Sequence, residues 1–89
     1  MATTQRRFFT IRIWAEGLGA TGKAIVVRTP VDTAEGLAAD TGRILGRQCQ
    51  LGTITRYSIG ASTSKQIARN RDTAPRWEEV IAGLEEAIA

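Results

Sequence analysis

Strict alternation of side chains near the N-terminus is the feature that most limits how this chain folds. Residues 7–16 read R-F-F-T-I-R-I-W-A-E, and Phe9, Ile11 and Ile13 alternate there with Phe8, Thr10, Arg12 and Trp14. A period of two is typical of a β-strand that buries one side. A second, β-branched run follows at residues 23–29 after three glycines, so the two runs are predicted to pair as an antiparallel hairpin.

Two later segments have the spacing of amphipathic helices. In residues 32–45, apolar and small side chains recur every three or four positions, Asp32 and Glu35 suggest a capping box, and Gly46 is the expected stop. Residues 75–89 place Pro75 in a first turn, then apolar and acidic side chains on opposite sides: Trp77, Val80, Ile81, Leu84 and Ile88 against Glu78, Glu79, Glu85 and Glu86.

The stretch between these helices predicts at least one more strand. Residues 50–59 are rich in Thr, Ile and Tyr, and a crossover through the first helix would lead to them. Residues 60–74 fit either a basic loop or a hairpin with residues 65–69 as a fourth strand, and the hairpin is the preferred interpretation. The expected fold is a single α+β domain, residues 1–89: an antiparallel sheet of three to five strands on one central helix, order β-β-α-β-(β)-α, with an amphipathic C-terminal helix.

Composition argues against most kinds of chemistry. The 89 residues include no histidine and one cysteine, Cys49, so an intramolecular disulfide is impossible and metal or catalytic-triad sites are disfavoured. We therefore expect no catalytic residue, no metal and no cofactor. No apolar run is long enough for a membrane span, which predicts a cytoplasmic protein of a bacterial host cell, without a membrane partner.

A glycine-rich string at residues 17–24, G-L-G-A-T-G-K-A, matches two nucleotide-binding patterns. A phosphate-binding loop needs Ser or Thr where this chain has Ala24, and both patterns require a helix to follow. A strand is predicted there instead. The string is therefore interpreted as a hairpin turn.

Charge is sorted along the chain rather than mixed. Residues 41–76 carry seven basic side chains and one acidic one, Asp72, in a protein whose net charge is +3. Arginine forms paired hydrogen bonds with phosphates and carboxylates alike, so an anionic partner is expected, either nucleic acid or an acidic protein surface. The candidate partner-binding residues are Arg43, Arg47, Arg56, Lys65, Arg69 and Arg71.

A second candidate surface follows from the strand alternation. If Phe9 and Ile11 face the helices, the other side of the sheet presents Phe8, Arg12, Trp14 and Arg28, joined by Arg56 in one of two registers. Aromatic and arginine side chains on an open sheet would stack bases and neutralise phosphates. The competing interpretation places Phe8 and Trp14 under the C-terminal helix or in a dimer seam.

The run Q-C-Q-L-G-T-I-T-R at residues 48–56 resembles a small type I-F anti-CRISPR family of phages and mobile elements. The matched positions are Gln48, Cys49, Gly52, Thr53, Ile54 and Arg56, with Trp77 near a late tryptophan of that family. The resemblance implies a curved antiparallel sheet around one helix that binds a CRISPR surveillance complex, a host nucleoprotein, where target DNA would pair. Arg56 alone carries over as a contact, and the C-terminal helix departs from the family.

Three hypotheses about function follow. The first is a non-enzymatic phage or mobile-element module that inhibits a nucleic-acid-handling host complex, docking a basic surface where nucleic acid would bind. The second is direct binding of DNA or RNA by the basic and aromatic sheet face. The third is a small structural protein that forms a homodimer through its C-terminal helix.

Overall fold

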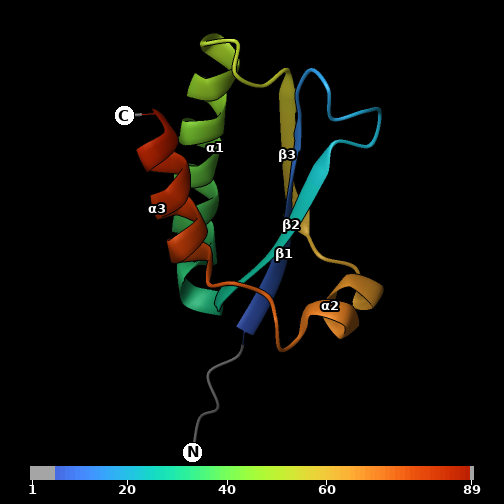
Figure 1. Ribbon diagram of the computed structural model, residues 1–89. Coiled ribbons are helices and arrows are strands. Elements are labelled where there is room, and N and C mark those ends of the chain that lie inside the picture. Colours follow the sequence, from blue (N-terminus) through green and yellow to red (C-terminus); the bar gives the residue numbers. More distant parts are fainter. Residues whose placement is uncertain (1–5, 89) are drawn as a thin grey trace, which may run out of the picture.

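An antiparallel sheet of three strands forms the middle of the fold, with two long helices on one side and a short helix on the other (Figure 1). The computed structural model describes the backbone of residues 6–88. Its elements are β1 (Arg6–Trp14), β2 (Lys23–Pro30), the 3₁₀ turn η1 (Val31–Thr33), α1 (Ala34–Gln50), β3 (Arg56–Ala61), α2 (Ser64–Asn70) and α3 (Trp77–Ile88). The predicted α+β class is confirmed, with three strands. None of the described helices is both long and apolar enough to span a bilayer.

The central strand of the sheet is β1, in the order β2-β1-β3, and both neighbours pair with it antiparallel. Ile11 lies opposite Ile25 on β2 and opposite Ile59 on β3, so these side chains point to the same side of the sheet. The predicted hairpin is confirmed. The predicted crossover is also present, because β2 and β3 run in the same direction and α1 connects them across β1.

The core lies between the sheet and the layer formed by α1 and α3. Trp77 at the start of α3 is fully buried, and its ring centroid is 4.9 Å from that of Phe9 on β1. Its indole N–H donates to Thr41 Oγ1 on α1 at 2.8 Å, and Thr41 donates to the Leu37 carbonyl at 2.7 Å. The predicted apolar side of the C-terminal helix therefore faces the core; Ile88 and Ala89 lie outside the described side chains.

Both predicted ends of the first helix are wrong. Asp32 lies in η1, and the N-cap Thr33 makes no side-chain cap, so the expected capping box does not form. Gly46 continues the helix. The stop comes at Gly52, whose φ of +79° favours glycine, where its N–H bonds to Cys49 O at 3.1 Å and Thr53 N–H to Gln48 O at 2.9 Å. Because residues 51–55 make this turn, the third strand begins at Arg56 and not at residue 50.

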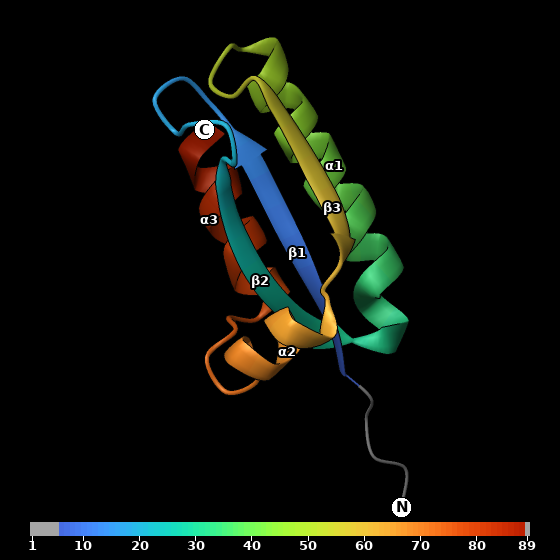
Figure 2. The same cartoon turned by 90° about the vertical axis from the view of Figure 1, so that its right-hand side faces the viewer.

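The predicted fourth strand is also wrong, because the segment forms α2. Gln66 N–H donates to Thr63 Oγ1 at 3.2 Å, and Thr63 N–H donates to Gln66 Oε1 at 2.9 Å, which is a complete capping box. Thr10 on β1 donates to the same Gln66 oxygen at 3.0 Å and lies 2.9 Å from Ser62 Oγ. These bonds hold α2 over the lower end of the sheet, on the side away from α1 and α3 (Figure 2).

Residues 71–76, which we call the strap, carry the chain from α2 around the edge of β2 to α3. Arg28 on β2 donates its backbone N–H to Pro75 O at 3.1 Å and its side-chain Nε to Ala74 O at 2.9 Å. Pro75 thus belongs to the strap and not, as predicted, to the first turn of the last helix, which begins at Trp77.

Candidate nucleic-acid interface

The side of the sheet opposite α1 and α3, which we call the open face, gathers the second predicted set of residues. Phe9 and Ile11 pack against the core, so alternation turns Phe8, Arg12 and Trp14 to the open face. The register then places Arg28 opposite Phe8, and Arg56 opposite Trp14. The structure therefore selects the register in which Arg56 joins the set.

Trp14 and Arg56 stack at one end of the open face. The Arg56 guanidinium carbon lies 3.9 Å from the centroid of the Trp14 ring, a cation–π contact. The indole N–H donates to Ala20 O in the hairpin turn at 2.9 Å. Trp14 is therefore covered by Arg56 and the turn. The competing interpretation, in which the C-terminal helix covers Trp14, is wrong because α3 lies on the opposite side of the sheet (Figure 1).

Two further arginines on the open face are oriented by backbone carbonyls. Arg12 Nη1 donates to Thr21 O at 2.6 Å, and Arg28 Nε donates to Ala74 O at 2.9 Å. Both side chains are half-buried. Each of these bonds uses one of the five N–H donors of a guanidinium, so the charge is fixed in position while other donors remain for an anion.

Between the arginines the open face is low, because Ser58 on β3 has a small side chain and Gly60 has none, and both residues are exposed. They lie beside Arg12 and Thr10, respectively, in the register of β1 and β3. Sequence reasoning missed these positions, although the same alternation that identified Trp14 would have found them once the register was known. The small centre leaves space for a ligand that lies across the strands.

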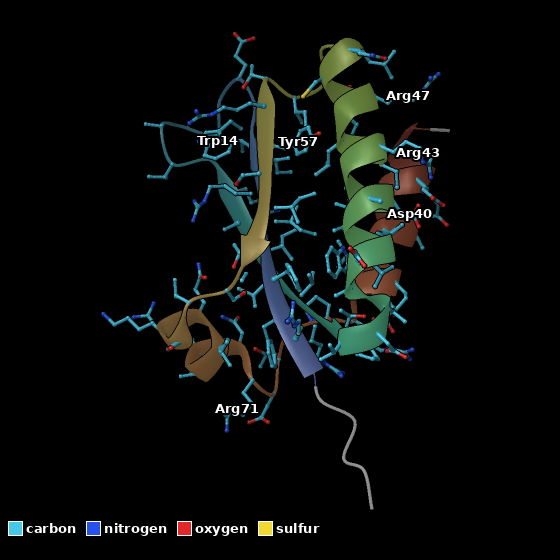
Figure 3. The ribbon with its side chains drawn as sticks, turned by 180° about the vertical axis from the view of Figure 1, so that it is seen from behind. Trp14, Asp40, Arg43, Arg47, Tyr57 and Arg71 are labelled. Atoms are coloured by element: carbon cyan, nitrogen blue, oxygen red, sulfur yellow. The ribbon has the colours of Figure 1, made fainter. Side chains whose placement is uncertain are left out.

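The short helix α2 adds further basic side chains on the same side of the molecule as the open face. Lys65 and Arg69 are exposed on α2, and Arg71 is exposed just after it, at the lower end of the molecule (Figure 3). We call these three together with Arg12, Arg28 and Arg56 the basic face. The acidic residues near it are Glu16 in the hairpin turn and Asp72 in the strap.

The other two predicted partner-binding residues lie elsewhere. Arg43 and Arg47 project from α1 away from the sheet (Figure 3), and Arg43 Nη2 is 3.9 Å from Glu85 Oε1 on α3. The six residues grouped by charge therefore divide between two sides of the molecule. η1, α1 and α3, which we call the helix layer, also hold seven of the nine acidic residues: Asp32, Glu35, Asp40, Glu78, Glu79, Glu85 and Glu86.

The remaining motifs have structural explanations. The glycine-rich string forms the turn between β1 and β2, with positive φ at Gly17, Gly19 and Gly22, and β2 follows it where a nucleotide loop needs a helix. Cys49 is half-buried near the end of α1. Within residues 6–88, no three His, Cys, Asp or Glu side chains come together as metal ligands would.

The run that carries the anti-CRISPR resemblance is the end of α1, its stop and the start of β3. Gln48 and Ile54 are buried, Gly52 makes the turn, and Arg56 is exposed on the open face. Comparison of the chain with models of protein families, with curated proteins and with solved structures found no match. Inference about function therefore depends on the site itself.

Proposed function

We propose that this protein is a binding module for single-stranded nucleic acid, which it holds on the basic face. The observation that carries the proposal is the separation of charge: three arginines from three strands and three more cations at α2 share one side, while seven acids lie in the helix layer. Such a field attracts a polyanion to one side only.

The shape of the basic face supports a single strand as the ligand. A sheet with small central side chains accommodates bases that lie across it, whereas the helix on this side, α2, has only seven residues and is held against the sheet by the bond from Thr10 to Gln66. The exposed side of the Arg56 guanidinium, backed by Trp14 at 3.9 Å, offers a surface on which a base stacks. Arg12 and Arg28 would contact phosphates in this arrangement.

Fluorescence anisotropy of labelled oligonucleotides across a salt series tests the proposal. Arg69→Ala/Arg71→Ala removes two exposed charges from the basic face, and the matched control Arg43→Ala/Arg47→Ala removes two exposed charges from the helix layer. Each lost phosphate contact lowers the log–log salt slope by about 0.7 for a single strand. We expect the slope to fall by about 1.4 in the first variant and to stay unchanged in the control. Equal loss in both variants, or tighter binding of duplex than of single strand, would contradict the proposal.

The second candidate is the inhibitor hypothesis, in which the basic face docks on a nucleic-acid-handling host complex in place of its nucleic acid. It is favoured by the position of Arg56, the one matched residue that is exposed on the basic face. Absence of oligonucleotide binding near physiological salt would favour this candidate. Its own test is competition with target DNA for a purified CRISPR surveillance complex, which Arg56→Ala should weaken.

A further inference from the structure

The outer side of α1 is exposed and hollowed. An open groove of about 750 Å³ lies there, lined by Gly42, Arg43, Ile44, Gly46, Arg47 and Gln50 of α1 and by Glu85 of α3. The groove is on the opposite side of the molecule from the basic face, so the proposed nucleic-acid site does not account for it.

Charge changes sign along the exposed surface of α1. Glu35 and Asp40 are exposed in the first part of the helix, and Arg43 and Arg47 are exposed in the second. Asp40, Arg43 and Arg47 all project away from the sheet (Figure 3). Among the described residues Arg43 is 3.9 Å from Glu85, while neither Asp40 nor Arg47 has a cation or carboxylate within 4.0 Å.

This pattern is complementary to itself when two helices run antiparallel. A two-fold axis on the outer side of α1, level with residues 41 and 42 along the helix, brings Asp40 of one chain beside Arg43 of the other, twice, and brings the acidic first turn of each helix toward Arg47 of its partner. The small, exposed residues Gly36 and Ala39 on the same helix allow the two axes to approach closely. A parallel arrangement would instead place like charges together.

We propose that a second copy of this chain docks on the outer side of α1, with the two α1 helices antiparallel. A polyanion is a poorer occupant, because Glu85 lines the groove and Asp40 lies one turn away. The apolar side of α3, the dimer surface predicted from the sequence, is instead packed into the core of the monomer. The α1 dimer would carry its two basic faces outward, on opposite sides.

Sedimentation velocity without nucleic acid tests this interface. The wild-type protein should move from the 9.6 kDa of one chain toward twice that mass as its concentration rises to about 1 mM. Arg43→Asp alone and Asp40→Arg alone should each remain monomeric, since each homodimer would then hold like charges. An equimolar mixture of the two variants should form a dimer again, because every cross-chain pair is restored.

A variant that was monomeric because it had misfolded would not form a dimer on mixing, so recovery of the dimer in the mixture excludes that explanation. Circular dichroism of each variant checks the fold directly. Arg69→Ala/Arg71→Ala, on the other side of the molecule, should leave dimerisation unchanged. A wild-type protein that stays at 9.6 kDa over the whole series would overturn the proposal. So would a dimer that persists in both single variants.

Discussion

At the scale of single residues, the fold depends on one buried polar contact between the two long helices. Trp77 and Thr41 are fully buried, and the only polar atom of the indole, Nε1, donates to Thr41 Oγ1 at 2.8 Å. A buried donor without a partner costs more than the bond itself contributes, because the donor has also lost water. The threonine hydroxyl thus fixes how α3 rests on α1.

We predict that Thr41→Val lowers the free energy of unfolding by about 1–3 kcal/mol, since valine keeps the shape of threonine but leaves the indole N–H without an acceptor. Chemical denaturation followed by tryptophan fluorescence measures the change. Thr41→Ser, which keeps the hydroxyl, should retain more stability than the valine variant despite its lost methyl group. The opposite ranking would show that packing, and not the hydrogen bond, matters at this position.

At the scale of elements, α2 is the part of the fold that depends most on local bonds. A helix of seven residues is too short to be stable by itself, and none of its residues is fully buried. The Thr63–Gln66 capping box and the bond from Thr10 to Gln66 therefore hold it against the sheet. Because α2 presents Lys65 and Arg69, its order affects the basic face.

We predict that Thr63→Ala costs about 1 kcal/mol of helix stability, the usual effect of losing an N-cap hydroxyl. Amide hydrogen exchange should become faster at Gln66 and Ile67 while the exchange of β1 amides stays unchanged. Affinity for single-stranded nucleic acid should fall in parallel. Ser64→Ala, at the exposed first position of α2, is the control and should preserve protection; equal loss there would assign the effect to something other than the cap.

The sequence predicted the strands and the two long helices because their periodic patterns extend over many residues. It missed α2 because Lys65–Arg69 is short and its single isoleucine fits either period, although the pair Thr63 and Gln66 was a readable capping signal. The predicted end of α1 at Gly46 is wrong because a glycine marks the end of a helix where its φ is positive. That conformation occurs at Gly52 and not at Gly46.

The candidate site was predictable in its members but not in its grouping. Alternation was sufficient to place Arg12 and Trp14 together, whereas Arg56 required the register of β1 and β3. Grouping basic residues by their proximity in the sequence placed Arg43 and Arg47 together with Arg56. In the structure they are on opposite sides of the molecule, because α1 and β3 lie in different layers. The contact from Trp14 to Ala20 depends on how the hairpin turn folds back, which no local pattern encodes.

At the scale of the whole molecule, the two sides carry opposite charge. The helix layer holds seven acidic and two basic side chains, while most of the remaining cations lie on the sheet, α2 and the strap. A molecule of this kind is oriented by an approaching polyanion before contact. If the basic face binds nucleic acid as we propose, the acids on α3 would therefore influence the rate of encounter without touching the ligand.

We predict that Glu79→Gln/Glu86→Gln, two exposed substitutions on α3, increase the association rate constant for a single-stranded oligonucleotide several-fold at low salt. Removal of negative charge weakens long-range repulsion, which acts over about 30 Å at 0.01 M salt but only about 3 Å at 1 M. Stopped-flow fluorescence measures both rate constants. The dissociation rate should remain unchanged, and an increase that persists at 1 M salt would contradict this explanation.

The strap has a consequence for solubility. A β-strand at the edge of a sheet exposes unpaired backbone groups on which other chains can assemble into aggregates. Arg28 prevents this along part of β2, because its backbone N–H and its Nε are both bonded to carbonyls of residues 74 and 75. The arginine that contributes charge to the basic face thus also helps to hold the strap over this edge, and loss of its Nε bond to Ala74 O would loosen that cover and raise the turbidity of a concentrated sample.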